Sequence, residues 1–194
     1  NYGYNIDRFI LDDTSSLGKF LSNAPTTQYA RLTDYGTFPF FNFLPAGDVD
    51  RVYKIRYKCY NSSGGLLDNI TVATAWTQGG ATYNSSWVHM KLMYAGAFPA
   101  NLRNENADFQ AVVALGTLDY YTVQAQDGSD VAVSELYTIK IICPNERGYE
   151  GIRLTWLNQW GVWDYYTFNM KSTRALTTNR TSYTQLGGTW NESD

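Results

Sequence analysis

The chain holds few side chains of the kinds that enzymes use for acid–base or nucleophilic chemistry. Its single histidine, His89, falls on the polar face of an expected strand, beside Lys91. A catalytic triad would have to be assembled around this histidine, and no nucleophile stands in a G-x-S-x-G turn. A lone histidine on a polar strand face is most simply a surface residue. The sequence therefore predicts no catalytic residues, no enzyme and no cofactor.

Three pairs of aspartates could supply the two facing carboxylates that glycoside hydrolysis needs. Each pair lies in a stretch rich in turn residues, where aspartate is frequent because its side chain accepts hydrogen bonds from backbone amides. The third pair also hints at a calcium loop, but the remaining oxygen ligands of a full loop are missing. We therefore interpret the pairs as solvated turns and predict no metal site. The pairs are Asp12/Asp13, Asp48/Asp50 and Asp127/Asp130.

Two cysteines, Cys59 and Cys143, are too few for a disulfide-rich scaffold or for a zinc site. Strand alternation places both on the inward faces of their expected strands, so one bridge between them is open to the chain. Two buried thiols are the simpler interpretation, because a free cysteine behaves as a small hydrophobic residue. We predict buried thiols and keep a single disulfide as the alternative.

The overall composition favours a strand-rich protein and argues against nucleic-acid binding and membrane insertion. Aromatic residues make up 16% of the 194 residues, with 16 tyrosines among them, whereas charged residues make up only 17%. Enrichment in tyrosine, threonine and valine favours strands over helices. The net charge of −3 argues against a nucleic-acid partner. No apolar run approaches the roughly 18 residues that cross a bilayer, so we expect no membrane insertion.

Alternation of apolar and polar residues predicts the main strands. The clearest is 51–60, where Tyr53, Ile55, Tyr57 and Cys59 share one face. Several short strands separated by turn residues predict an all-β fold, an antiparallel β-sandwich. Further strands are expected within residues 37–44, 66–74, 88–94, 118–126 and 135–143.

The opposite face of the strand at 51–60 is basic, because Lys54, Arg56 and Lys58 alternate with the apolar residues. This row could bind an anionic partner. Outward lysines more often keep a sheet soluble and block edge pairing, and we favour that interpretation.

The middle of the chain is expected to hold a strand and a short helix. The strand at 88–94 would turn Val88, Met90, Leu92 and Tyr94 inward. Between residues 102 and 113, weak apolar spacing of helical period allows a short crossover helix.

A domain boundary is expected near residue 145, where a stretch with a proline, two glycines and alternating charges begins. It divides the chain into a β-sandwich domain at 1–145 and a small module at 146–194. In the module, residues 152–157 and 162–168 are typical of a β-hairpin. Roughly 45 residues are few for an independent core. The module is therefore expected to pack on the first domain, to continue past a truncation, or to be completed by another subunit.

Aromatic side chains occupy both faces of this hairpin, so both faces need cover. One interpretation is an ordinary core. A second is a protein–protein surface, since tryptophan and tyrosine dominate interface energetics. A third is a platform on which sugars stack. The residues concerned are Trp156, Trp160, Trp163, Tyr165, Tyr166 and Phe168, with Gly161 permitting the turn.

The hairpin segment, residues 152–172, reads IRLTWLNQWGVWDYYTFNMKS. It resembles a segment of virion structural proteins of tailed bacteriophages, particularly marine and Bacteroidetes-infecting ones, where such a pattern follows a sandwich-like domain. The pieces at 20–32 and 94–102 agree with those proteins too, so the resemblance touches most of the chain. It implies a place in the virion, either tail-associated or on the capsid surface, with the tail preferred. It brings no catalytic residues with it.

Together with the composition, the resemblance implies a non-enzymatic structural component of a tailed-bacteriophage virion. Such a protein is expected to form homo-oligomers and to bind other virion subunits through its aromatic β surfaces. The alternative is a carbohydrate-binding or host-adhesion module, in which an exposed side chain such as Trp76 or Trp87 stacks on a host surface glycan. A polysaccharide hydrolase ranks last, because nothing in the chain resembles an organised acid–base pair.

Overall fold

The computed structural model describes residues 6–9, 11, 17–42, 52–73, 77–78, 81–82, 91–142, 151–169, 175 and 177–181. A short 3-10 helix, η1, spans Ile6–Phe9, and two α-helices span Pro99–Glu105 (α1) and Ala107–Ala114 (α2). The strands are β1 (Thr27–Ala30), β2 (Thr37–Asn42), β3 (Lys54–Tyr60), β4 (Leu66–Ala73), β5 (Thr77–Gln78), β6 (Ala81–Thr82), β7 (Lys91–Gly96), β8 (Tyr120–Gln126), β9 (Tyr137–Ile141), β10 (Ile152–Leu157) and β11 (Trp163–Phe168).

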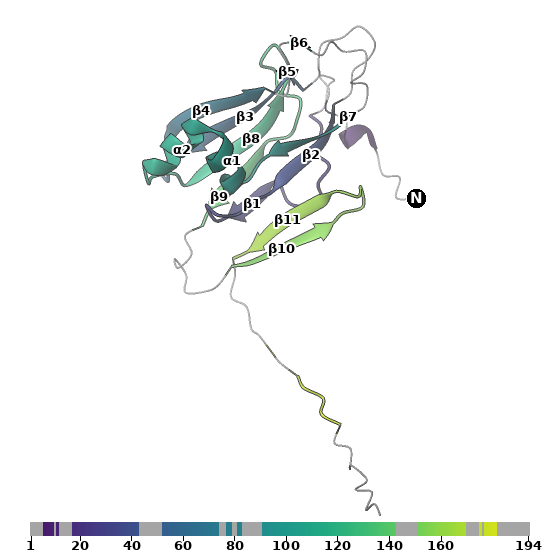
Figure 1. The fold of residues 1–194 in the computed structure, drawn as a ribbon. Helices are drawn as coiled ribbons and strands as arrows, with labels where there is room; N and C mark the ends of the chain where they lie inside the picture. The colour runs from purple at the N-terminus through teal and green to yellow at the C-terminus, as the bar shows by residue number, and fades with distance from the viewer. Residues whose placement is uncertain are drawn as a thin grey trace, which may run out of the picture.

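The centre of the fold is a five-stranded sheet in the order β1-β9-β8-β3-β4 (Figure 1). Neighbouring strands run antiparallel, except at the edge where β1 runs parallel to β9. The pairs β2–β7, β5–β6 and β10–β11 form separate two-stranded sheets. The predicted β-rich class is thus confirmed. The parallel edge was not expected, because alternation within a strand carries no information about the direction of a distant partner.

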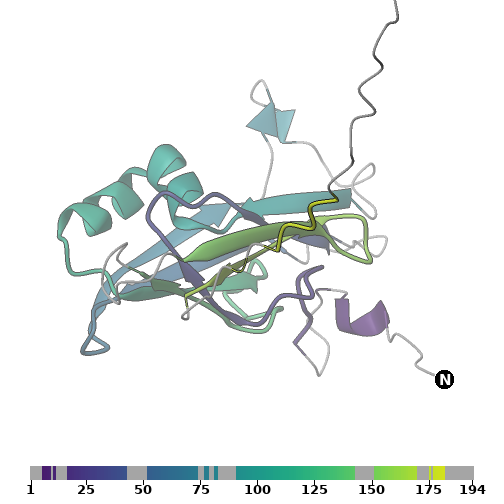
Figure 2. The ribbon, with the colours of Figure 1, turned by 90° about the horizontal axis from the view of Figure 1, so that it is seen from below.

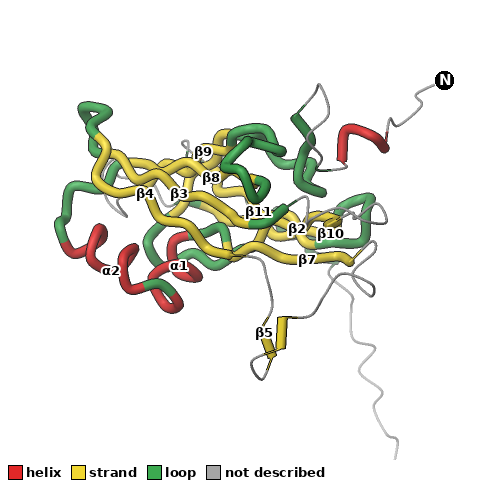
Figure 3. The backbone as a smooth tube through the Cα atoms, turned by 90° about the horizontal axis from the view of Figure 1, so that it is seen from above, coloured by secondary structure: helices red, strands yellow, loops and turns green. Residues whose placement is uncertain are grey.

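One face of the five-stranded sheet forms the main core. Ile55, Tyr57 and Cys59 of β3 are buried there, beside Tyr121 and Val123 of β8. The helices and the β2–β7 pair cover this face as a second layer (Figures 2 and 3). The covering segments contribute Phe38, Phe40, Phe98, Leu102, Phe109 and Val112 to the core.

A helical segment crosses between β7 and β8, where the weak apolar spacing allowed one. It consists of two short helices rather than one. Pro99 opens α1, at a position where the missing N–H has no helical partner to lose. Asn106 separates the helices and caps α2, since its side-chain oxygen accepts a hydrogen bond from the Phe109 amide at 2.8 Å. Phe109 and Val112 then point from α2 into the core.

Two tyrosines that alternation placed inward lie outside the core. Tyr53 is 39% exposed and Tyr94 is 55% exposed. In β7 it is the preceding residue, Met93, that packs against the core. The predicted phase of this strand was wrong because both of its faces carry apolar residues, so that alternation alone cannot choose between them. Val88 and Met90 lie outside the described residues.

Two tyrosine hydroxyls join the sheet to the layer that covers it. Tyr57 Oη donates a hydrogen bond to the Gly96 carbonyl at 2.9 Å, and Tyr121 Oη donates to the Ala97 carbonyl at 2.7 Å. Tyr121 is fully buried. Water therefore cannot replace its hydrogen bond when the hydroxyl is removed.

Replacing Tyr121 with phenylalanine is expected to lower the free energy of unfolding by about 1–2 kcal/mol, because the Ala97 carbonyl loses its donor in a buried place. Urea unfolding followed by circular dichroism measures the change. The matched control is Tyr53→Phe, whose hydroxyl has no hydrogen bond to another described residue. It should cost less than about 0.5 kcal/mol. Equal costs for the two variants would contradict this role of the Tyr121 hydroxyl.

Candidate functional site

Of the predicted aspartate pairs, the structure describes Asp127 and Asp130, and both make contacts within the protein. Asp127 Oδ1 accepts hydrogen bonds from the backbone amides of Ser129 at 2.8 Å and Val131 at 2.7 Å. Asp130 forms an ion pair with Lys54. Among the described residues, no three His, Cys, Asp or Glu side chains gather as a metal site would require. The other predicted positions of this kind, Asp12, Asp13, Asp48, Asp50 and His89, lie outside the described residues.

Cys59 is a free, fully buried thiol, as the favoured interpretation expects. It stands opposite Tyr121 of β8, which in turn stands opposite Ile139 of β9. Burial raises the pKa of the Cys59 thiol to about 12, and Asp68 adds to the rise. Cys143 lies outside the described residues.

The aromatic segment folds as the predicted hairpin. Strands β10 and β11 pair antiparallel, with Ile152 opposite Phe168 at one end and Leu157 opposite Trp163 at the other. Among the described strands, β10 has no second neighbour, so it is the free edge of this pair. In Figure 1 the hairpin lies beside β1 and β2, and β11 is the strand that contacts them.

Asn158 organises the turn of the hairpin. Its Oδ1 accepts hydrogen bonds from the backbone amides of Trp160 at 2.9 Å and Val162 at 3.3 Å. Its Nδ2 donates to the Leu21 carbonyl at 2.9 Å, which fastens the turn to the N-terminal part of the chain. Gly161 has a φ of +73°, in the left-handed region that glycine adopts at little cost.

Asp164 anchors β11 to the same N-terminal segment. This carboxylate is only 2% exposed, and its Oδ2 accepts hydrogen bonds from the Asn23 amide at 2.9 Å and from Asn158 Nδ2 at 3.1 Å. A buried carboxylate is tolerated only when such donors replace water. Its position therefore fixes how the hairpin sits on the rest of the protein.

Arg153 is the second anchor, on β10. Its guanidinium donates hydrogen bonds to Thr167 Oγ1 at 2.9 Å, to the Tyr35 carbonyl at 2.5 Å and to Asp34 Oδ2 at 3.4 Å. It also lies over the Phe98 ring, 4.5 Å from the ring centroid. The side chains of Arg153 and Asp34 are 20% and 11% exposed, so this ion pair is largely shielded from water. Composition and spacing gave no signal for either anchor.

The six aromatic side chains of the hairpin divide into two groups. Some pack inward: the Trp160 ring lies 4.7 Å from that of Phe9, and the Tyr165 ring lies 5.8 Å from that of Phe98. Others keep large exposed areas. Trp156, Trp160, Tyr165 and Tyr166 are half-buried, whereas Trp163 is 53% exposed and Phe168 is 49% exposed.

One face of the hairpin presents a row of apolar side chains, here called the hairpin surface. Asp164 lies on the same face opposite Trp156, but it is covered by the segment around Asn23. Cross-strand pairing places Leu154 opposite Tyr166 and Ile152 opposite Phe168, so these side chains lie on one face. Leu154 is 48% exposed and Ile152 is 36% exposed. The hairpin surface consists of Ile152, Leu154, Trp156, Tyr166 and Phe168.

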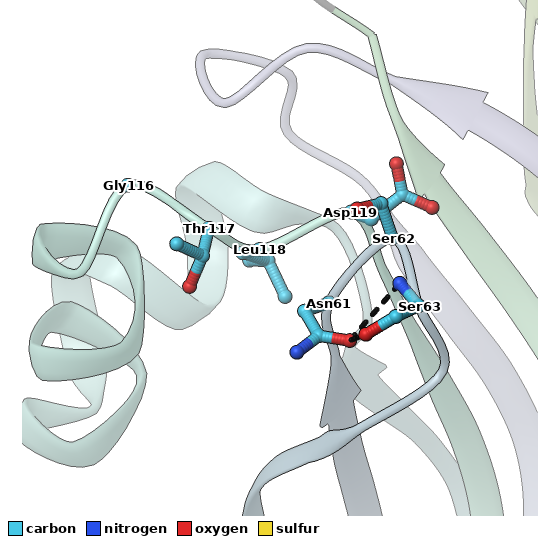
Figure 4. A pocket seen from close by; sticks show the side chains of 7 residues that line it. All are labelled: Asn61, Ser62, Ser63, Gly116, Thr117, Leu118 and Asp119. Carbon is cyan, nitrogen blue, oxygen red and sulfur yellow. Dashed lines mark hydrogen bonds between the residues drawn. The ribbon is translucent and has the colours of Figure 1, made fainter.

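A shallow polar hollow of about 420 Å³ lies at the end of the central sheet where β3 ends and β8 begins. It is bounded by the β3–β4 turn and the loop from α2 to β8 (Figure 4). Asn61 holds the turn, since its Oδ1 accepts hydrogen bonds from Ser63 and Gly65 amides at 3.1 and 2.7 Å. Its amide nitrogen and the Thr117 hydroxyl both face the space between the two loops. The sequence showed this stretch only as a turn.

The tryptophans that the sequence offered for glycan stacking, Trp76 and Trp87, lie outside the described residues. In the part of the chain that is described, no helix is long and apolar enough to cross a membrane. Comparisons of the chain with protein-family models, with curated proteins and with solved structures found no match.

Proposed function

We propose that this chain is a non-enzymatic structural component of a tailed-bacteriophage virion and that it assembles through the hairpin surface. The observation that carries the assembly role is the combination of a firmly anchored hairpin with an exposed apolar strip along its free edge. Arg153 and Asp164 hold the hairpin in place, so its exposed side is presented in one orientation. The resemblance of residues 152–172 to virion proteins supports a place in a tailed-bacteriophage virion.

The energetics favour coverage of the hairpin surface. Apolar area removed from water contributes about 25 cal/mol per Å², so each large side chain that becomes covered contributes on the order of 1–3 kcal/mol. Leu154 and Phe168 of this surface each keep about half of their area exposed. A free strand edge beside them adds unpaired backbone groups that a partner can bind. The partner would be another copy of the chain or another virion subunit.

Size-exclusion chromatography with light scattering tests the assembly role. The full chain is expected to form oligomers whose mass rises with protein concentration. Leu154→Ser should shift the equilibrium towards monomer by roughly tenfold in dissociation constant, as expected for losing an apolar contact near the centre of an interface. The matched control is Leu66→Ser on β4, since Leu66 is 56% exposed on another strand. A chain that stays strictly monomeric at high concentration would contradict the proposal.

The virion setting has a separate test. Mass spectrometry of purified particles should detect the chain together with other structural proteins, and its gene should stand near portal, terminase or tail genes. A chain encoded far from any such gene and missing from particles would exclude a virion role, even if it forms oligomers.

A further inference from the structure

The face of the central sheet opposite the core carries an ordered set of cations and tyrosines. Strand pairing aligns Lys58 with Thr122 and Thr138 in one row, and Tyr60 with Tyr120 and Lys140 in the next. The Tyr60 and Tyr120 rings stack 4.9 Å apart with an angle of 14° between their planes. These two rows are called the lysine–tyrosine face. It consists of Lys58, Tyr60, Tyr120, Thr122, Thr138 and Lys140.

The two lysines of this face keep their charges unneutralised within the described part of the chain. Of the neighbouring cations on β3, Lys54 is paired with Asp130, and Arg56 donates a hydrogen bond to the neutral side chain of Gln124 at 2.8 Å. Lys58 and Lys140 have no ion pair or hydrogen bond through their side chains to any described residue. A local excess of positive charge therefore stands out on a chain whose net charge is −3.

Among the described residues, the elements that cover the sheet leave Lys140 and the edges of this face open, whereas Thr122 at its centre is only 8% exposed. Helices α1 and α2 and the β2–β7 pair lie on the other side of the sheet (Figure 3). On the lysine side of the sheet, the loops near residue 18 and at 127–136 contact the strands around Gln124 and Gln126, at the other end of β8 from Tyr120. There Gln124 Nε2 donates to the Ser134 carbonyl and Gln126 Nε2 donates to the Asp130 carbonyl. Lys140 is exposed, and Lys58 is half-buried among its strand neighbours.

We propose that the lysine–tyrosine face binds an acidic polysaccharide. From the usual strand spacing and rise, the Cα atoms of Lys58 and Lys140 are separated by about 12 Å, so two lysine side chains can reach charges on one extended polymer. The hydroxyls of the half-buried Thr138, Tyr60 and Tyr120 donate to and accept from sugar hydroxyls, whereas the buried Thr122 makes no contact with the ligand. Ammonium groups bind carboxylates and sulfates as point charges, without demanding one geometry.

The polar hollow extends the same surface. Asn61 follows Tyr60 and Asp119 precedes Tyr120, so the hollow lies at the end of the two strands that carry the stacked tyrosines. Its Asn61 amide and Thr117 hydroxyl add hydrogen-bonding groups for a sugar ring (Figure 4). The Asp119 carboxylate also lines the hollow, so this end of the surface accepts from a sugar hydroxyl and repels an acid group. A nucleic acid fits less well, because the negative net charge of the chain repels a densely charged strand at long range. This site differs from the tryptophan-based glycan site that the sequence suggested, and it is independent of the hairpin surface.

Biolayer interferometry of the full chain on immobilised alginate tests the proposal, with neutral dextran as the reference polymer. Binding is expected at about 50 mM salt and should weaken several-fold at about 300 mM, because screening shortens the reach of the lysine charges. The double variant Lys58→Gln/Lys140→Gln should lose roughly tenfold in affinity. Lys58→Arg/Lys140→Arg should restore most of it. Thermal melting confirms that each variant stays folded.

The matched control removes the same net charge elsewhere. Arg103 and Arg180 are exposed cations away from this face, so Arg103→Gln/Arg180→Gln should bind alginate as the unmodified chain does. Equal losses in the two double variants would overturn the assignment of the site. Failure of the unmodified chain to bind alginate or heparin would overturn the proposal itself. Binding to polyglutamate or to duplex DNA at least as tight as to alginate would overturn the choice of polysaccharide as partner.

Discussion

Replacing Arg153 with methionine is expected to lower the free energy of unfolding by about 3 kcal/mol and to loosen the β10–β11 hairpin before the rest of the fold. Methionine keeps much of the apolar contact with Phe98 but removes every hydrogen bond of the guanidinium. The largest cost comes from Asp34, whose side chain is 11% exposed and is left without its cation. Burial lowers the pKa of Arg153, while Asp34 raises it in partial compensation.

Two measurements distinguish loosening of the hairpin from general destabilisation. Urea unfolding gives the total loss, and hydrogen exchange should show faster exchange in β10 and β11 than in β3 and β8. Arg153→Lys keeps the charge but lacks the planar guanidinium, whose two terminal nitrogens reach Thr167, Tyr35 and Asp34 at once, so it should recover less than half of the loss. The control is Arg103→Met, because Arg103 is exposed on α1. Uniform exchange across both sheets would contradict the anchoring role of Arg153.

Raising the pH from about 9 towards 12 is expected to destabilise the fold by an amount comparable to its total stability. Burial raises the pKa values of Tyr57, Tyr121 and Tyr137 above the ordinary tyrosine value, and raises that of Cys59 to about 12. In the unfolded chain these groups lose their protons at ordinary values, near 8.5 for the thiol and near 10 for the phenols. The unfolded state therefore binds fewer protons than the folded state, and stability falls as pH rises.

The size of this effect follows from the number of groups involved. Each group contributes about 1.4 kcal/mol per pH unit while it titrates only in the unfolded chain. At pH 11 the thiol of the unfolded chain lies about 2.5 pH units above its pKa and each phenol about one unit above, so the four groups together contribute about 7–8 kcal/mol. Below about pH 8.5 none of these groups should affect how the free energy of unfolding changes with pH.

Thermal melts at a series of pH values measure the effect, with tyrosinate absorbance near 295 nm recorded in parallel. Tyrosinate should appear together with loss of structure for the buried tyrosines. The variant Cys59→Ala removes the thiol, so its stability should fall less steeply between about pH 9 and 10. A melting temperature that stays constant from pH 8 to pH 11 would show that these groups are not held neutral by burial.

The strands of the central sheet could be predicted closely where one face is apolar and the other polar. In β3, Ile55, Tyr57 and Cys59 alternate with three basic residues, and the predicted phase holds for the whole strand. In β7, Tyr94 and its neighbours are apolar on both faces, so the phase was set by packing against β2.

The hairpin at the candidate site likewise combines features that the sequence predicts with features that only packing decides. Its two strands and its turn at Gly161 were predicted, because they depend on neighbours within a few residues. Its anchors were not, since 141 residues separate Asn23 from Asp164 and 119 separate Asp34 from Arg153. No regular spacing along the sequence predicts that two such distant residues will bind each other. The same holds for the lysine–tyrosine face, where three strands from distant parts of the chain bring the residues together.

By itself, the sequence determined a β-rich chain with one aromatic hairpin and a basic row on β3. Only the tertiary structure decided which side chains are covered, which carboxylate is buried, and which apolar strip is left for a partner. The physical reason is that strand and turn preferences act over a few neighbouring residues. Burial depends on packing between segments that are far apart along the chain.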